Sequence, residues 1–196
     1  MQKRLNIEDT ILWDSLRTGN ETAFEELYRR YFQVLFSYGK RLINDEDAVK
    51  DAIQDLFIDI WRTHKNLNQS QSVKFYLISS LRRKIHRSLQ PDYLLRDDWE
   101  NVNEQLLPVH PSVENDFTQI EEEYLNKEKV NAWLLQLPAR QNEALVLRYF
   151  HNFEYSEIAQ ILDIKEQTAR NLVQKAIILL RKMAISLIIT SLLFFL

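Results

Sequence analysis

The sequence predicts an all-α protein with two small helical domains joined by an acidic linker. First, apolar residues recur three and four positions apart over most of the chain, as they do on the buried face of a helix. Second, only two glycines and four prolines occur in 196 residues, too few for the many tight turns of a sheet protein. Third, an acidic stretch containing prolines separates these patterns into two groups. We expect domains at residues 1–90 and 120–182, a linker at 91–119 and an apolar tail at 183–196.

Charge follows the same division, although the formal net charge of −3 conceals it. Residues 1–90 carry 15 basic and 12 acidic side chains, and residues 126–196 carry nine and six. Residues 91–125 carry one basic and ten acidic side chains. Two mildly basic domains therefore flank a strongly acidic connector, which would be repelled by DNA laid along it.

The composition argues against enzymatic chemistry. The chain has no cysteine, which excludes a disulfide framework, a thiol nucleophile and a cysteine-ligated zinc site. Its four histidines, His64, His86, His110 and His151, have no metal-ligand spacing, and no glycine-rich phosphate loop is present. We therefore expect no catalytic site, no metal and no cofactor. The first ten residues lack the apolar core of a secretory signal, so a cytoplasmic location is expected.

Three amphipathic helices are expected in the first domain. Thr22 followed by Glu25 has the pattern of a capping box and would begin the first helix. Asn44 with Asp47 would begin the second in the same way, and the third would follow the polar stretch 65–72. Their predicted buried stripes consist of apolar and aromatic side chains at helical spacing: Ala23, Phe24, Leu27, Tyr28, Tyr31, Phe32, Leu35 and Phe36; Ala48, Val49, Ala52, Ile53, Leu56, Phe57, Ile60 and Trp61; and Val73, Tyr76, Leu77, Leu81 and Ile85.

The second domain follows a linker marked by Pro91, Pro108 and Pro111. A helix is expected from Asp116 onward, and Pro138 suits the first turn of the next helix. The domain is therefore predicted to be helical throughout.

The segment 154–182 has the pattern of a helix-turn-helix, with a short helix that ends at Leu162. Asp163 stands where a tight turn needs a left-handed backbone, for which Asp and Asn are the best choices after Gly. Ile164 would fill the angle between the two helices, and small Ala159 would let them approach closely. The second helix has a regular inward face: Ala169, Leu172, Val173 and Ala176.

The outward face of this second helix carries long, hydrogen-bonding and mostly basic side chains. The first turn of such a helix can enter the major groove and contact base edges, while flanking cations hold phosphates. A generic helical hairpin with a solvated polar face is the alternative interpretation. The combined pattern favours DNA recognition by Lys165, Gln167, Thr168, Arg170, Asn171, Gln174 and Lys175, with Glu166 on the same face.

Both domains resemble parts of bacterial RNA polymerase sigma factors. The string LPARQNEALVLRYFHNFEYSEIAQIL is similar to region four, which recognises the upstream promoter element. The string AFEELYRRYFQVLFSYGKRLINDEDAVKDAIQDLFIDIWR resembles the part of region two that binds the polymerase clamp, and FYLISSLRRKIHRSL the part that binds the downstream element. The resemblance covers about residues 10–90 and 120–182, in the two-domain layout of the extracytoplasmic-function (ECF) type. It implies promoter-specific transcription initiation without catalysis, with core RNA polymerase, promoter DNA and an anti-sigma factor as partners.

Two surfaces of the first domain gain a role from this resemblance. It assigns the face opposite the buried stripe of the second helix to the polymerase clamp, although a solvated helix face is the simpler interpretation: Asp51, Gln54, Asp55, Ile58 and Asp59, with Arg62 beside them. The third helix carries a basic track beside Phe75 and Tyr76, which could follow a DNA backbone and catch unstacked bases: Lys74, Arg82, Arg83 and Arg87, with Lys84 and His86 on the same helix. Sigma factors usually have Asn where Arg83 stands and Asp where Arg87 stands, so base readout in this segment is expected to differ.

The linker and the tail leave alternatives open. In the family the linker runs through the positively charged RNA-exit path, and a solubilising tether is an equal alternative. The tail 183–196 has no charge, and as a helix of about 21 Å it is shorter than the roughly 30 Å hydrocarbon core of a bilayer. We expect a helical extension that packs on this protein, on another copy or on an inhibitor, with shallow membrane contact as the second interpretation.

Two other functions remain open on the sequence alone. A stand-alone regulator could bind DNA as a dimer through the same helix-turn-helix, and it would then bind tightly without polymerase. A membrane-associated interaction protein could use the apolar tail.

Overall fold

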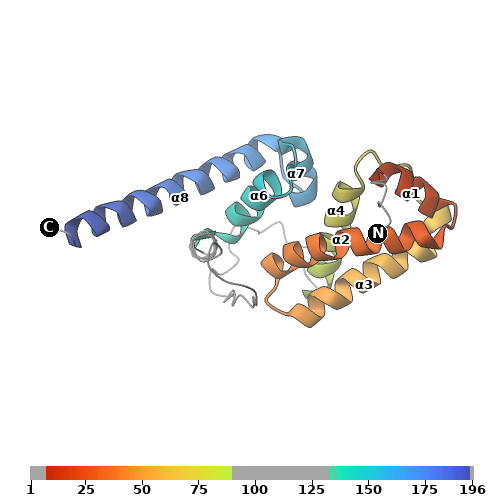
Figure 1. The fold of residues 1–196 in the computed structure, drawn as a ribbon. Coiled ribbons are helices and arrows are strands. Elements are labelled where there is room, and N and C mark those ends of the chain that lie inside the picture. The colour runs from red at the N-terminus through yellow and green to blue at the C-terminus, as the bar shows by residue number, and fades with distance from the viewer. Residues whose placement is uncertain (1–7, 90–132, 135, 195–196) are drawn as a thin grey trace, which may run out of the picture. The chain divides into compact units, whose positions relative to one another are not determined.

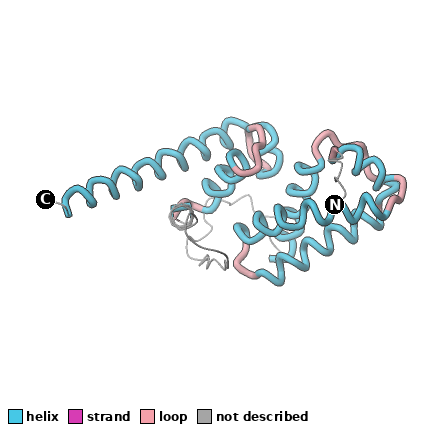
Figure 2. The backbone as a smooth tube through the Cα atoms, viewed as in Figure 1, coloured by secondary structure: helices cyan, strands magenta, loops and turns pink. Residues whose placement is uncertain are grey.

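The computed structural model describes residues 8–89, 133–134 and 136–194. The chain forms two compact units, residues 1–100 and 101–196 (Figures 1 and 2). Every regular element within the described residues is a helix, so the predicted all-α fold class is confirmed. The linker at 91–119 and most of the helix expected from Asp116 lie outside the described residues. The predicted boundaries between the four segments therefore stay predictions.

Within residues 8–89, the first unit contains four α-helices and one short 3₁₀-helix. They are α1 (Asp9–Arg17), α2 (Glu21–Leu42), α3 (Glu46–Arg62), η1 (His64–Asn66) and α4 (Val73–Leu89). The core lies between α2, α3 and α4, where each helix turns one apolar stripe inward. The largest fully buried side chains on these three helices are Leu27, Leu35, Tyr38, Ile53, Ile60, Leu77, Ile78, Leu81 and Ile85.

The predicted starts of α2 and α3 were slightly wrong, whereas α4 begins directly after the polar stretch 65–72, as predicted. Helix α2 is capped by Asn20, whose side chain accepts from the Ala23 N–H at 3.0 Å, so the helix begins before Thr22. Helix α3 is capped by Asp45 instead of Asn44, and its carboxylate accepts from the N–H groups of two residues in the first turn at 3.0 Å. Asn44 and Asp45 are both residue types that can cap a helix. The charged carboxylate of Asp45 is favoured as the cap because the N-terminal end of a helix carries a partial positive charge.

Helix α1 was not predicted, because nine residues give too short a periodic pattern. Its Leu12, Trp13 and Leu16 are buried, and the Trp13 indole N–H donates to the Asn68 carbonyl at 3.0 Å. Arg17 donates to the Leu67 carbonyl at 2.7 Å. Helix α1 therefore anchors the loop between α3 and α4.

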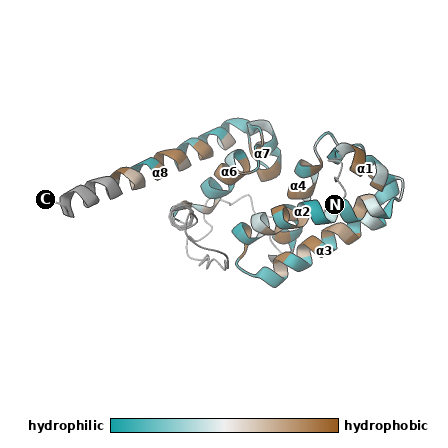
Figure 3. Ribbon diagram, viewed as in Figure 1, coloured by the Kyte–Doolittle hydropathy of each residue, from teal (hydrophilic) through white to brown (hydrophobic). Residues whose placement is uncertain are grey.

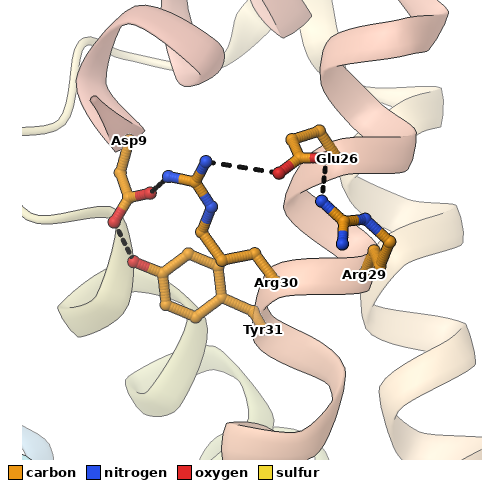
Figure 4. Close-up of polar contacts among 5 residues, drawn as sticks. All are labelled: Asp9, Glu26, Arg29, Arg30 and Tyr31. Carbon is orange, nitrogen blue, oxygen red and sulfur yellow. Dashed lines mark hydrogen bonds and ion pairs between the residues drawn. The ribbon is translucent and has the colours of Figure 1, made fainter. Parts of the chain in front are cut away.

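A polar cluster fastens α1 to α2 at its other end (Figure 4). The Asp9 carboxylate pairs with the Arg30 guanidinium and accepts a hydrogen bond from the Tyr31 hydroxyl. Arg30 also pairs with Glu26 at 3.3 Å, and Glu26 in turn pairs with Arg29. Burial and the Asp9 hydrogen bond raise the pKa of Tyr31, so its hydroxyl stays protonated and continues to donate.

Four aromatic residues of α2 were predicted to be buried but are only half-buried: Phe24, Tyr28, Phe32 and Phe36. They lie along one edge of the helix, where neighbouring rings contact each other, and the first two also contact two rings of α3. Tyr28 lies 4.9 Å from Phe57 and Phe24 lies 5.1 Å from Trp61, centroid to centroid. The side of α2 that faces the core is formed by Leu27, Tyr31 and Leu35. The four aromatic residues therefore lie at the margin of the core, where they are partly exposed.

The second unit contains α6 (Ala139–Tyr149), α7 (Tyr155–Leu162) and α8 (Glu166–Phe194). Pro138 is the N-cap residue of α6, with φ −52° and ψ 138°, and thus precedes the first turn, one position earlier than predicted. Ala144 and Leu147 of α6, Ile158 of α7 and Val173 of α8 are fully buried and form the centre of this core.

Helix α8 is continuous across the predicted end of the domain at Lys182 (Figures 1 and 3). The expected helical extension at 183–196 is therefore present as far as Phe194. It belongs to the same helix that carries the candidate DNA-binding face. Among the residues described, no helix combines the length and the apolar character needed to cross a membrane.

Candidate nucleic-acid interface

The turn between α7 and α8 has the geometry of a helix-turn-helix. Asp163 adopts the predicted left-handed backbone, with φ 54° and ψ 55°. The Ile164 N–H donates to the Ala159 carbonyl at 3.0 Å and closes the turn. Ala159 is 6% exposed, so its small side chain lies where the two helices meet. At the start of α7, the Glu154 N–H donates to the Glu157 carboxylate at 2.8 Å and fixes the entry of the chain.

Helix α8 turns its polar face outward, as predicted. Ala169, Val173 and Ala176 have no exposed surface, and Leu172 is half-buried. The candidate DNA-binding side chains emerge on the other side. Exposed ones are Lys165, Gln167, Thr168, Asn171, Gln174 and Lys175, and Arg170 is half-buried.

Three candidates on this face already have partners. The Gln167 amide donates to the Asn171 side-chain oxygen at 3.1 Å. Arg170 pairs with Glu166 at 3.0 Å, and its guanidinium carbon lies 4.4 Å from the centroid of the Tyr155 ring. The sequence pattern did not indicate the contact with Tyr155, because it joins residues of two helices whose packing is set by the fold.

The basic track of α4 lies beside a groove in the first unit. Arg83 and Arg87 are exposed, whereas Lys74 and Arg82 are half-buried. Burial lowers the pKa of Lys74. The groove has a volume of about 190 Å³, and its walls come from the end of α3 and from α4: Leu56, Asp59, Ile60, Thr63, Tyr76, Ser80, Arg83, Lys84 and Arg87.

Tyr76 is the aromatic wall of this groove and is held by α1. Its ring lies 4.9 Å from the buried Trp13 ring, at an interplanar angle of 58°. The Arg83 guanidinium donates to the Ser80 hydroxyl at 3.0 Å on the same wall. The groove thus combines a fixed ring, hydroxyl groups and cations.

The predicted polymerase-binding residues fall into two environments. Asp51, Gln54, Asp55 and Ile58 are exposed on one side of α3, and the Ile58 side chain is 52% exposed despite its apolar character. Asp59 instead belongs to the groove.

Asp59 makes two ion pairs. Its carboxylate pairs with Lys84 of α4 at 2.7 Å and with Arg62 at 2.9 Å. The hydrogen bond from Lys84 is the main cause that lowers the pKa of Asp59. Asp59 therefore connects α3 to the basic helix α4. Within the described residues, no three His, Cys, Asp or Glu side chains gather in a way that could hold a metal ion.

Known families match both units. The sigma-70 region 2 model matches residues 27–92, and the sigma-70 region 4 model matches residues 127–180. The first match covers α3 and α4 with the groove, and the second covers the helix-turn-helix.

Individual proteins align over most of their length. The chain is 22% identical to the ECF RNA polymerase sigma factor SigX of Bacillus subtilis over 171 residues, 83% of this chain and 84% of SigX. It is 28% identical to the RNA polymerase sigma factor YlaC of the same organism over 148 residues, 71% of this chain and 79% of YlaC.

A solved structure shares the fold. The sigma factor RpoE from Bartonella quintana, in complex with the anti-sigma factor NepR, matches with a TM-score of 0.59 and 19% identity, over 82% of this chain and 96% of that one. The two region matches, in this order along one chain, and the relatives of the same layout give one conclusion: the chain belongs to the sigma-70 family, as an RNA polymerase sigma factor of the ECF type.

Proposed function

We propose that this sigma factor directs core RNA polymerase to promoters through three separate surfaces. The exposed side of α3 binds the polymerase clamp, the groove beside α4 holds the downstream promoter element, and the first turns of α8 read the upstream element. One observation carries the proposal: two helical units follow each other in one chain, and each exposes cationic side chains along one helix. These are Arg83 and Arg87 on α4, and Lys175 on α8 with Lys165 directly before its first turn.

The upstream element is assigned to α8 because its side chains suit base edges. Arg pairs with guanine, and Asn or Gln with adenine, through two hydrogen bonds in the major groove. Gln167 and Asn171 are exposed one turn apart, so their mutual hydrogen bond can be exchanged for bonds to bases. Lys165 and Lys175 lie at either end of this face and are suited to phosphates, which position the helix without reading sequence.

The groove beside α4 suits a single unstacked nucleotide. An aromatic ring can stack on a base whatever its identity, and cations along the rim can follow the backbone. Tyr76 supplies the ring, and the exposed Arg83 and Arg87 supply the cations. Since these two arginines stand where Asn and Asp are usual, we propose that they hold phosphates and contribute little base selectivity.

The clamp is assigned to the exposed side of α3. Asp51, Asp55 and the amide of Gln54 surround Ile58, which gives a small apolar centre with an acidic rim. A positively charged partner surface with an apolar contact would fit it. Asp59 has a smaller part in this contact than the sequence suggested, because it is already paired with Lys84 and Arg62.

Two further features belong to the proposal. The protein carries out no reaction of its own, because the chemistry is that of the polymerase, and it acts in the cytoplasm beside that enzyme. The complex of RpoE with NepR supports an anti-sigma factor as a partner here too. Such a partner would block initiation by covering the exposed side of α3.

Run-off transcription tests the function. Core polymerase is incubated with genomic DNA fragments with and without the full-length protein, and transcripts are mapped. We expect discrete start sites only when the protein is present. An identical set of transcripts in both reactions would contradict the proposal.

Copurification with core polymerase tests the α3 surface. The double substitution Asp51→Ala and Asp55→Ala should reduce the amount of protein that copurifies with core polymerase, because two charges of the acidic rim are lost. Glu21→Ala with Glu25→Ala removes the same charge from exposed positions of α2 and should leave it unchanged. Equal recovery of both double variants would show that the clamp binds elsewhere.

A further inference from the structure

Side chains from α6, α7 and α8 meet at the ring of Tyr155, in the first turn of α7. The guanidinium carbon of Arg148, from α6, lies 4.8 Å from the ring centroid. The guanidinium carbon of Arg170, from α8, lies 4.4 Å from it. Both distances are within the range at which a cation is attracted to the ring. The same ring is therefore contacted by one arginine outside the predicted DNA-binding face and one on it.

Arg148 holds the ring from the α6 side. Its guanidinium donates to the Phe153 carbonyl at 2.8 Å and pairs with the Glu154 carboxylate at 3.0 Å. The hydrogen bond with Glu154 raises the pKa of Arg148. These bonds fix the chain immediately before Tyr155, so the position of the ring follows from contacts unrelated to DNA.

Arg170 lies between this ring and a carboxylate. It pairs with Glu166, one turn earlier on α8, at 3.0 Å, and its side chain remains 43% exposed. A planar guanidinium can stack on a ring and still present its N–H groups at the edge, whereas the ammonium of a lysine cannot. The ring thus restricts Arg170 to few orientations and leaves its donors accessible.

We propose that Tyr155 is a positioning residue for DNA recognition, whose ring orients the Arg170 guanidinium toward the major groove. Glu166 is the counter-ion that Arg170 exchanges for an acceptor on a base when DNA binds. This inference rests on the proposed role of α8 in reading the upstream element. A preoriented arginine loses less side-chain freedom on binding, so the contact gains affinity and discrimination.

The experiment uses full-length protein with core polymerase and a promoter found by the run-off assay. Each base pair of the upstream element is substituted in turn, and transcription from every promoter variant is measured. At one base pair of the upstream element, Arg170→Ala should reduce the preference for the native base pair over its substitutes by about tenfold, as expected for a bidentate contact. Tyr155→Leu should reduce it at the same base pair by about three- to tenfold, the range of a cation–ring contact.

Three further variants separate positioning from other effects. Tyr155→Phe keeps the ring and should discriminate as the wild type does. Arg170→Lys keeps the charge but loses the planar stack, and it should lose discrimination as Arg170→Ala does. Tyr149→Leu removes an exposed tyrosine of α6, 58% exposed, and is the matched control that should change nothing. The combination of Tyr155→Leu with Arg170→Ala should be no worse than Arg170→Ala alone, because both act through one contact.

The outcomes are distinct. If Tyr155→Leu discriminates as the wild type does while Arg170→Ala does not, the positioning role is overturned and the proposed function stands. The same holds if Tyr155→Leu lowers transcription equally from every promoter variant, as a purely structural defect would. Should Tyr155→Leu fail to fold, Arg170→Lys decides, and wild-type discrimination by this variant overturns the inference. A wild-type protein that yields no specific transcript contradicts the proposed function itself.

Discussion

Asp59 is the residue whose environment differs most from the sequence-based expectation. Helical spacing predicted that Asp59 would lie on the polymerase-binding face with Asp51 and Asp55. Its carboxylate instead pairs with Lys84 of α4. Helical spacing indicates which side of a helix a residue occupies, but not which neighbouring helix reaches it. Asp163 is the opposite case, since its left-handed backbone is a local property that the residue type already favoured. Single positions were thus predictable where local geometry decides and not where tertiary contacts do.

Asp59→Asn should destabilise the first unit in a pH-dependent way. The pKa of Asp59 is lowered by folding, so its contribution is present at neutral pH and is lost as pH falls through that lowered pKa. Because the Asp59 side chain is 44% exposed, solvent screening limits the contribution to less than about 1 kcal/mol.

Urea denaturation of both proteins in steps from pH 7 to pH 3 measures this difference in unfolding free energy. Asp55→Asn, an exposed position of the same helix, is the control and should show no such trend. A gap between the wild type and Asp59→Asn that persists undiminished at the lowest pH would mean that the ion pair is not its source.

Helices with long periodic patterns were predicted well, and the short helix α1 was missed. Helices α2, α3 and α4 lie where the apolar spacing placed them, and the starts of α2 and α3 are displaced by one or two residues. Helix α1 was missed although Trp13 is among the most buried residues, because its nine residues span fewer than three turns. The continuity of α8 past Lys182 agrees with the helical extension expected there, since neither Gly nor Pro interrupts the sequence.

The contact between α2 and α3 depends on Gly39. A Cβ atom at this position would lie 2.6 Å from Cγ1 of Val49 and 3.4 Å from Cδ1 of Ile85. Alanine has the higher helix propensity, by about 1 kcal/mol. We nevertheless expect Gly39→Ala to lower the unfolding free energy by about 1–2 kcal/mol, because overpacking of a buried contact outweighs that gain.

Chemical denaturation measures the effect of Gly39→Ala, and a second substitution tests its cause. Val49→Ala removes the clashing methyl groups, so the double variant should be more stable than the sum of the two single effects predicts. Additive effects, or an alanine at 39 that stabilises the protein, would contradict the close approach of the two helices.

Truncation after Lys182 should leave the second unit folded. Among the α8 residues whose burial the structure describes, 166–185, the last fully buried side chain is Ala176, and the half-buried Leu179 and Leu180 also precede the cut. We expect the unfolding free energy to change by no more than about 0.5 kcal/mol, as for surface changes. Thermal denaturation of full-length and truncated protein measures this, and a clearly larger loss would mean that the tail packs on the domain.

At the scale of the whole molecule, the distribution of charge and apolar residues along the chain already indicates two basic helical units separated by an acidic segment. The order of the units and the basic face of each helix were predictable because both are properties of the chain. The groove beside α4 and the arginine contacts at Tyr155 were not, since each joins residues that only folding brings together. The path of the acidic linker lies outside the described residues and stays a prediction.

The two DNA-contacting units are expected to depend on each other through polymerase. Two exposed cations lie on the described candidate DNA-binding face of each unit, Arg83 and Arg87 in the first and Lys165 and Lys175 in the second, so each unit alone should bind DNA weakly and with a strong dependence on salt. Core polymerase would hold both on one promoter at once, and the second contact then forms at a high effective concentration.

The most direct test is therefore a binding titration on a promoter found by run-off transcription. Labelled promoter DNA and a scrambled fragment of equal length are titrated with the protein alone, with core polymerase alone and with both, at one fixed salt concentration. We predict tight binding that distinguishes the promoter from the scrambled fragment only when both proteins are present. Equally tight and selective binding by the protein alone would contradict this dependence, because it would identify a stand-alone DNA-binding regulator.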